Sequence, residues 1–257
     1  MEYRVAIPSY KRADLIQKKT LNYLQECNID PACIDIFVAN KEEYDIYKKS
    51  LPKDTYANLI IGELGYNNVK NFMADYYPKN IPIVHFDDDV NRLMRLSYKN
   101  GKKILENFYD LDKLVRFGFK MMDNYDSSLL GFSPVNTTLY MDNSISQGLY
   151  FCIGNFYLQY NKRKFRLKYP DYADFELCLK TYLIDGKVLR LNNIVAITQY
   201  GSTDGGTQTY RSFKMMKKIS KELIDKYPQY IKYNPKPYNP YEVRFIRQKD
   251  NEKIKFE

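Results

Sequence analysis

Tryptophan is absent from this chain of 257 residues, and histidine occurs only once, as His85. The four cysteines have no Cys-x-x-Cys spacing and no neighbouring histidine. We therefore expect reduced core thiols and neither a zinc site nor a disulfide framework. No apolar run approaches the roughly 18 residues that span a bilayer. The chain opens on a predicted strand instead of a signal peptide. These absences predict a cytoplasmic protein without a transmembrane segment, in the host cytoplasm if a phage encodes it.

Aromatic and basic residues are plentiful instead. The chain has 26 Tyr and 14 Phe, a hydrophobic fraction of 44%, and a net charge of +9. Residues 210–257 alone carry 13 Lys and Arg against 6 Asp and Glu. Such a basic tail favours a polyanionic partner, namely nucleic acid, an acidic membrane or a phosphorylated substrate. The alternative is a basic surface that only keeps the protein soluble.

The first ninety residues alternate between short apolar runs and amphipathic segments, which predicts right-handed βαβ crossovers and a parallel sheet. We expect α/β architecture in one domain with a small C-terminal extension. The predicted strands are 3–8, 34–39, 58–62 and 82–86, and the predicted helices are 13–27, 42–51 and 67–77.

The second half predicts helices and strands in a less regular order. The apolar spacing favours helices over 110–125, 174–183 and 213–227, and strands over 129–140, 149–157 and 188–198. Residues 201–207 are rich in glycine and predict a mobile loop. The prolines after residue 227 predict an extended tail that packs on the domain.

Three consecutive acids, Asp87, Asp88 and Asp89, follow the apolar run Pro82–Phe86. Carboxylates at the end of a buried strand are costly to desolvate unless a cation joins them. Ligands bind at that end of the strands in open α/β sheets. Carboxylate oxygens suit Mg²⁺ or Mn²⁺ with phosphate. The alternative is a solvated acidic turn that caps the next helix.

Residues 1–200 resemble a glycosyltransferase of the GT-A fold, with a Rossmann-like, mostly parallel sheet flanked by helices. Three motifs carry this resemblance, in the family's order: Ile7-Pro8-Ser9-Tyr10-Lys11-Arg12; Gly62-Glu63-Leu64-Gly65 with Lys70-Asn71; and Asp87-Asp88-Asp89 at the position of the DxD motif. The resemblance implies a nucleotide-sugar donor, UDP-glucose first, and Mn²⁺ or Mg²⁺. It assigns the donor to Pro8, Ser9, Tyr10, Arg12, Gly65, Lys70, Asn71, Asp87 and Asp88, and the metal to Asp87 and Asp89.

The acidic start of the 174–183 helix resembles the catalytic helix of inverting members of this family. Asp174 takes the position of the base, and Ala173 stands where a Glu usually precedes it. This departure leaves Asp174, Glu176 and Asp171 as candidates for taking the proton of the acceptor hydroxyl. In the alternative interpretation Asp174 is only a helix N-cap.

A third metal ligand from a late loop is common in the family. Asp204, in the glycine-rich loop, is the candidate. His85 lies on the same strand face as Asp87, and we favour a hydrogen-bonded core residue over a metal-associated one.

The basic stretch Lys162-Arg163-Lys164-Phe165-Arg166-Leu167-Lys168 combines cations with an aromatic ring, as surfaces that follow a phosphate backbone do. A basic GT-A enzyme of this size resembles the TET-associated glycosyltransferases, which implies 5-hydroxymethyl-pyrimidines in DNA as the acceptor. The alternatives are a glycan or lipid-linked acceptor, a nucleotidyltransferase, and an inactive nucleic-acid-binding protein. We expect a donor half over 1–95, an acceptor half over 96–200, and the glycine-rich loop and basic tail over 201–257.

Overall fold

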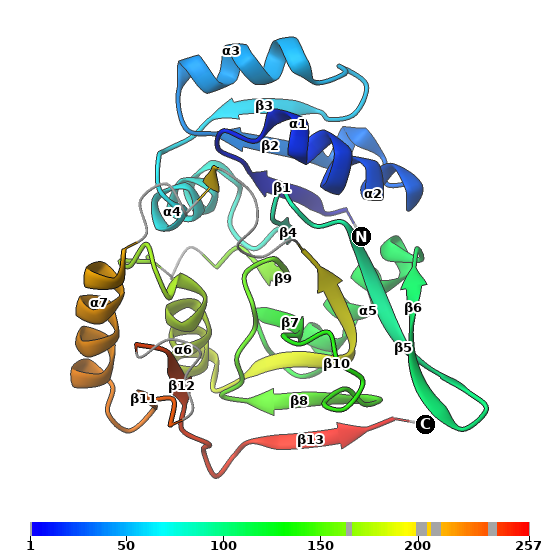
Figure 1. Cartoon of the computed structure of the whole chain (residues 1–257). Coiled ribbons are helices and arrows are strands. Elements are labelled where there is room, and N and C mark those ends of the chain that lie inside the picture. Colours follow the sequence, from blue (N-terminus) through cyan, green and yellow to red (C-terminus); the bar gives the residue numbers. More distant parts are fainter. Residues whose placement is uncertain (1, 163–165, 199–204, 207–211, 236–240, 257) are drawn as a thin grey trace.

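The structure is a computed structural model of the chain, and it describes residues 2–162, 166–198, 205–206, 212–235 and 241–256 (Figure 1). Its helices are α1 (Ala13–Ile16), the π-helical η1 (Gln17–Leu21), α2 (Asn22–Glu26), the 3-10 turn η2 (Pro31–Cys33), α3 (Lys41–Ser50), α4 (Tyr66–Tyr76), α5 (Leu111–Asn124), α6 (Ala173–Asp185) and α7 (Phe213–Lys226). Its strands are β1 (Arg4–Pro8), β2 (Ile34–Val38), β3 (Asn58–Ile61), β4 (Pro82–Phe86), β5 (Arg92–Lys99), β6 (Lys102–Phe108), β7 (Leu129–Ser133), β8 (Ser144–Gly148), β9 (Phe156–Tyr160), β10 (Val188–Ile197), β11 (Ile231–Tyr233), β12 (Val243–Phe245) and β13 (Glu252–Lys255).

The predicted parallel sheet is confirmed in the first half of the chain. Strands β3, β2, β1 and β4 lie side by side and all pairs are parallel. Val5 in β1 pairs with Ile34 on one side and with Val84 on the other. The carboxyl ends of β1 and β4 therefore meet at the same edge of the sheet.

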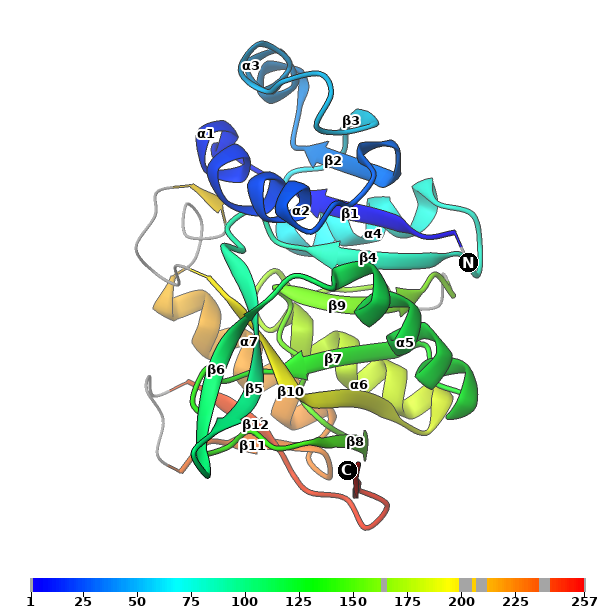
Figure 2. The ribbon, with the colours of Figure 1, turned by 90° about the vertical axis from the view of Figure 1, so that its right-hand side faces the viewer.

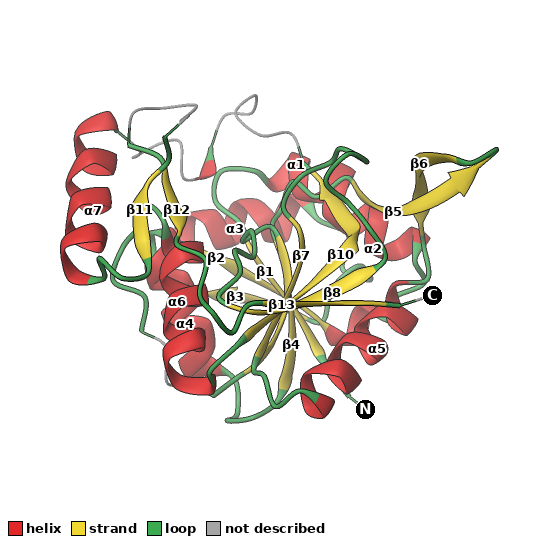
Figure 3. Cartoon of the chain, turned by 90° about the horizontal axis from the view of Figure 1, so that it is seen from below, coloured by secondary structure: helices red, strands yellow, loops and turns green. Residues whose placement is uncertain are grey.

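Helices cover both faces of the sheet, with α4 and α6 on one side and α2 and α5 on the other (Figures 2 and 3). The alternation of side chains along β1 produces this layering. Val5 and Ile7 pack into the cluster that contains Leu24 of α2, whereas Ala6 packs with Met73 of α4. Because both faces of β1 are covered, the strand has a continuous apolar sequence.

The second half of the sheet is mixed. Strand β9 is antiparallel to both β4 and β7, and β10 is parallel to β7 but antiparallel to β8. The two long strands predicted over 129–140 and 149–157 were wrong in their bounds. Pro134 follows the last residue of β7 and has no N–H to donate to a ladder. The side chain of Asn251 bonds the backbone N–H and carbonyl of Leu149, so no neighbouring strand pairs with them.

Strands β5 and β6 form a hairpin that was not predicted from the sequence, although its turn is a recognisable signal. Asn100 and Gly101 both have positive φ, 51° and 74°, as the two central residues of a type I′ hairpin turn do. Strand β5 also pairs with β10, so the hairpin branches from the main sheet.

The described part of the C-terminal tail returns to the domain. Strand β13 pairs with β8 at the edge of the sheet, and β11 and β12 form a separate two-stranded sheet. Leu223 of α7 and Ile231 of β11 pack against Leu179 of α6. Among the described residues, no helix has both the length and the apolar character that a membrane crossing requires.

Candidate active site

The loop after β1 and the acids after β4 lie in contact at the carboxyl edge of the sheet. The hydroxyl of Ser9 donates a hydrogen bond of 2.6 Å to Asp88 Oδ2 and lies 2.7 Å from the hydroxyl of Tyr47 in α3. All three side chains are buried. Two of the three sequence motifs that carry the resemblance are therefore joined by a direct contact.

Arg12 adds a cation to this cluster. Its Nη1 lies 3.0 Å from Asp88 Oδ1 and 3.8 Å from Asp89 Oδ2, and its side chain is only 11% exposed. Its backbone N–H donates to the hydroxyl of Tyr47 at 2.9 Å. Ser9 and Arg12 thus bond the two oxygens of Asp88 separately.

The π-helical segment η1 holds the turn that contains the acids. Thr20, in this segment, donates its hydroxyl proton to the carbonyl of Asp87 at 2.7 Å and accepts the N–H of Val90 at 3.1 Å. A π-helical turn moves a side chain relative to regular helical spacing, and such turns are frequent at functional sites. Here it brings a buried hydroxyl beneath the acidic strand end.

The three acids follow the end of β4, with Asp88 and Asp89 in a turn, and they differ in exposure. Asp88 is 4% exposed and points to Ser9 and Arg12, whereas Asp87 and Asp89 are half-buried. Burial raises the pKa of Asp88 to about 6, although Arg12 and Ser9 oppose this shift. Burial also raises the pKa of Asp87 and of Asp89. A further positive charge at this edge would favour the ionised carboxylates.

The donor set fits a hard divalent ion, since carboxylate oxygens are what Mg²⁺ and Mn²⁺ prefer. Within the described ranges, no group of three or more His, Cys, Asp or Glu is arranged to hold a metal. Mg²⁺ is commonly bound through one or two carboxylates together with substrate phosphates and waters, so a complete protein cage is not required. The proposed late ligand, Asp204, lies outside the described residues.

Lys70 lies behind Asp87 and not in open solvent. The side chain is buried, and its Nζ lies 3.5 Å from His85 Nδ1. The same Nζ lies 5.2 Å from the ring centroid of Tyr66 and 5.0 Å from that of Tyr157. Burial lowers the pKa of Lys70, and the charge of Asp87 opposes this shift. His85 is 3% exposed and stacks on Tyr157 at 4.4 Å, as the core interpretation of this histidine expects.

Gly65 and Asn71 both have structural roles: Gly65 begins a helix, and Asn71 bonds the backbone of a neighbouring segment. Gly65 is the N-cap of α4 and has a φ of 102°, a backbone angle that residues with a side chain rarely adopt. The side chain of Asn71 donates to the carbonyl of Leu167 at 2.9 Å and accepts the N–H of Leu167 at 2.8 Å. Asn71 thus fixes the 166–169 segment beside the site.

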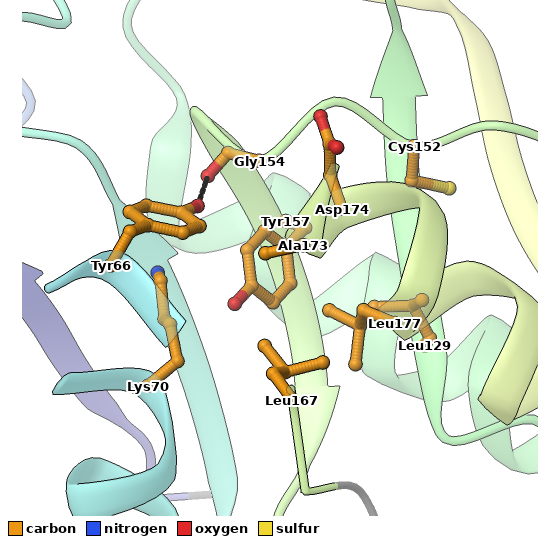
Figure 4. Close-up of a pocket in the computed structure, with 10 residues that line it drawn as sticks. All are labelled: Tyr66, Lys70, Leu129, Cys152, Gly154, Tyr157, Leu167, Ala173, Asp174 and Leu177. Carbon is orange, nitrogen blue, oxygen red and sulfur yellow. Dashed lines mark hydrogen bonds between the residues drawn. The ribbon is translucent and has the colours of Figure 1, made fainter. Parts of the chain in front are cut away.

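A small pocket separates Lys70 of α4 from Asp174 of α6 (Figure 4). It leaves about 10 Å³ for the centre of a water-sized molecule, roughly the space that one water requires. At its rim the hydroxyl of Tyr66 donates to the carbonyl of Gly154 at 3.3 Å. The lining residues are Tyr66, Lys70, Leu129, Cys152, Gly154, Tyr157, Leu167, Ala173, Asp174 and Leu177.

Asp174 lies in the first turn of α6, but it is not the N-cap. Tyr172 is the N-cap, with a φ of 60° and no side-chain capping bond, so the N-cap interpretation of Asp174 was wrong. Asp174 Oδ1 accepts the N–H of Phe175 at 2.9 Å, and the residue lines the pocket, with its carboxylate directed away from Lys70 and Tyr157 (Figure 4). The helix N-terminus stabilises its negative charge.

Glu176 has a different environment. It is 3% exposed, its Oε2 accepts the N–H groups of Lys168 and Tyr169 at 2.7 and 3.1 Å, and its Oε1 lies 2.6 Å from Lys180 Nζ. Oε2 therefore holds the 168–169 segment against α6, whereas Oε1 pairs with a lysine of the same helix.

The basic stretch is partly neutralised by neighbouring acids. Arg166 forms a two-pronged ion pair with Asp75 of α4, and Lys168 Nζ lies 3.2 Å from Glu222 of α7. Lys162 is half-buried, and Arg163 and Lys164 lie outside the described residues.

Three residues that support the site, Thr20, Tyr47 and Tyr66, were not predicted from the sequence. Thr20 follows two lysines inside a helical pattern, and no sequence signal marks the π-helical turn. Tyr47 lies on the predicted helix 42–51, where an aromatic at helical spacing indicates only a core contact. Tyr66 directly follows Gly65 of the second motif, so its place beside that motif is the one signal that could have identified it.

Neither the scan against protein-family models nor the search of curated proteins finds a match. Solved structures do match. S. aureus TarS 1–349 in complex with UDP-GlcNAc is 12% identical, with a TM-score of 0.55 over 88% of this chain and 67% of that chain. The longer S. aureus TarS structure has 12% identity and a TM-score of 0.52, again over 88% of this chain. This chain spans 40% of the length of that longer structure.

These neighbours define the class of fold. The mixed α/β architecture, with parallel strands at its centre and helices on both faces, matches the GT-A glycosyltransferase type. The GT-A fold expected from the motifs is therefore confirmed.

Proposed function

We propose that this protein is a glycosyltransferase that moves a sugar from a nucleotide-sugar donor to an acceptor hydroxyl. The observation that supports this best is the contact between Ser9 and Asp88, which joins the loop after β1 to the acids after β4. In open α/β sheets ligands bind where the carboxyl ends of the strands meet. We assign residues 1–95 to the donor half, 96–200 to the acceptor half, and 201–257 to a tail on the same domain.

The donor is proposed to be a UDP-sugar, because the solved TarS neighbours include a complex with UDP-GlcNAc. UDP-glucose remains our first candidate from the sequence resemblance. The β1 loop, with Pro8, Ser9 and Tyr10, is placed at the nucleobase, and Arg12 at the diphosphate, since a guanidinium pairs with phosphate in two-pronged geometry. The burial of Lys70 beside His85 and Tyr157 supports an indirect role, in which its charge acts on Asp87.

Asp174 is the proposed general base. An inverting transfer needs a carboxylate that accepts the proton of the acceptor hydroxyl while its oxygen attacks the anomeric carbon. Asp174 meets this need because it stands at the pocket on the N-terminal turn of α6, whereas both oxygens of Glu176 bond the protein. Asp87 and Asp89 are the proposed metal ligands, and the ion, when bound, would neutralise the departing diphosphate.

The acceptor that we put first is DNA with 5-hydroxymethyl-pyrimidines, supported by the net charge of +9 and the basic tail. The ion pairs of Arg166 and Lys168 with Asp75 and Glu222 reduce this support, because paired cations attract phosphate less. This observation favours a second candidate, a glycan or lipid-linked hydroxyl. A nucleic-acid-binding protein that retains the fold without activity is the third.

A transfer assay with several UDP-sugars tests these proposals. The purified protein is incubated with Mn²⁺ and each donor, with and without DNA that contains 5-hydroxymethyl-pyrimidines. Metal-dependent sugar on the DNA supports the complete proposal. UDP release without sugar on the DNA would support the transferase activity and favour a glycan as the acceptor. No turnover and no UDP binding would contradict the transferase.

A further inference from the structure

The guanidinium of Arg12 lies beside two of the three acids that follow β4. It contacts Asp88 at 3.0 Å and approaches Asp89 Oδ2 to 3.8 Å. Both acids belong to the cluster that we place at the donor diphosphate. A positive charge this close to Asp89 opposes the binding of a second cation by Coulomb repulsion.

Backbone from a distant part of the chain holds the guanidinium in this position. The carbonyl of Gly205 accepts from Arg12 Nη2 at 3.4 Å, and the N–H of Gly206 donates to the carbonyl of Tyr10 at 3.1 Å. A Cβ on Gly206 would lie 2.8 Å from Arg12 Cζ and 3.0 Å from both terminal nitrogens. The glycine backbone therefore packs flat against the guanidinium, and a side chain at 206 would force it to move.

We infer that Arg12 is a resident counter-cation of the acidic cluster. In the nucleotide-free protein it neutralises Asp88 and Asp89 and weakens the binding of a divalent ion. A bound diphosphate then forms the ion pair with the guanidinium, so Asp89 becomes available to coordinate the divalent ion. This inference rests on the proposed donor site for its second step only, since the first step concerns the protein and a metal alone.

The geometry explains why a diphosphate would be the trigger. Arg12 bonds one oxygen of Asp88, while the other is held by Ser9, so Asp88 keeps a hydrogen-bond partner when the guanidinium swings away. A diphosphate carries more charge than one carboxylate and matches the fork of donors on a guanidinium. Metal and nucleotide are thus expected to bind cooperatively.

The first experiment titrates Mn²⁺ alone, with free ion measured by electron paramagnetic resonance. Arg12→Gln is expected to bind Mn²⁺ ~10-fold more tightly than the wild type, because one repelling charge is removed. Arg12→Lys keeps the charge and should resemble the wild type. Equal Mn²⁺ affinity of the wild type and Arg12→Gln would overturn the inference.

Glycine variants test the same point without removing the charge. Gly206→Ala should displace the guanidinium and tighten Mn²⁺ binding in the direction of Arg12→Gln. Gly101→Ala is the matched control, because Gly101 also has a positive φ, 74°, but a Cβ added there would meet nothing within 4 Å. Gly206→Ala with wild-type Mn²⁺ affinity would show that the glycine backbone does not hold the guanidinium.

The second experiment repeats the titration with UDP present. UDP should tighten Mn²⁺ binding by the wild type ~10-fold or more and have a smaller effect on Arg12→Gln, since the coupling passes through that charge. If UDP tightened Mn²⁺ binding as much in Arg12→Gln as in the wild type, the proposed release of Arg12 from the acids by the diphosphate would be overturned. If UDP binds under no condition, the proposed donor site fails, while the titration with Mn²⁺ alone still decides the role of Arg12.

Discussion

Ser9 and Asp88 are 79 residues apart in the chain, and a hydrogen bond of 2.6 Å joins their side chains. This bond is possible because β1 and β4 are parallel neighbours, so the residues that follow both strands reach the same edge of the sheet. The hydroxyl also lies 2.7 Å from Tyr47, which connects α3 to the same cluster. One small side chain thus joins three elements at the proposed donor site.

Replacement of Ser9 by Ala should loosen this connection. The change leaves Asp88 with one fewer buried partner, and a buried group that loses its hydrogen bond costs about 1–3 kcal/mol. We expect a lower free energy of unfolding in urea and weaker UDP binding by calorimetry. Ser50→Ala, at an exposed position at the end of α3, is the control. An unchanged Ser9→Ala protein would remove this bond from the account of the site.

Thr20→Val tests whether the π-helical turn holds the acids in place. Valine has the same shape but lacks the hydroxyl that bonds Asp87 and Val90, so we expect a loss of about 1–3 kcal/mol. Thr181→Val is a matched control, because the equally buried hydroxyl of Thr181 bonds only the carbonyl of Leu177 in its own helix. Urea unfolding of both variants compares the two costs. Equal losses would show that Thr20 has no special role.

Asp174→Asn and Glu176→Gln should separate catalysis from stability. Asp174→Asn is expected to retain UDP binding and to reduce transfer by about 10²–10⁴-fold, the usual contribution of a general base. Glu176→Gln should instead lower the thermal unfolding temperature, because Glu176 bonds two backbone N–H groups and Lys180. Single-turnover transfer and thermal unfolding are measured on both. A fully active Asp174→Asn variant would assign the base to another residue.

The ion pairs of the basic stretch predict an uneven response to charge removal. Neutralising Lys162, Arg163 and Lys164 should reduce the slope of DNA affinity against salt, since each phosphate contact contributes to that slope. Neutralising Arg166 and Lys168 should leave the slope nearly unchanged, because acids already pair them. Fluorescence anisotropy at several salt concentrations measures both slopes. Equal slopes for the wild type and the first variant would place DNA on another face.

The cysteines should react slowly in the folded protein. Burial raises the pKa of Cys27 to about 11 and that of Cys33 to about 11, so few thiolates exist at pH 8. Cys152 and Cys178 are buried. We expect slow alkylation at pH 8, faster alkylation as the pH rises toward 11, and four reactive thiols after denaturation. Rapid labelling of the native protein at pH 8 would contradict this packing.

The sequence by itself determined the parallel half of the fold. Apolar runs such as 34–38 have no alternation because both faces of the strand are covered, and this pattern is visible without a structure. The order of Ser9, Gly65 and the acids at 87–89 along these crossovers also follows from the chain alone, because parallel strands place their carboxyl ends together.

Only the tertiary structure decided what those residues contact. The partners Arg12 of Asp88, Lys168 of Glu176 and Asp75 of Arg166 come from 76, 8 and 91 residues away in the chain, and no local pattern encodes such pairings between separate elements. The pairing of β5 with β10 and the return of β13 to β8 also depend on contacts that are distant in the chain. Packing therefore separated Asp174, which stands at the pocket, from Glu176, which holds a loop, although both lie in the first turn of the same helix.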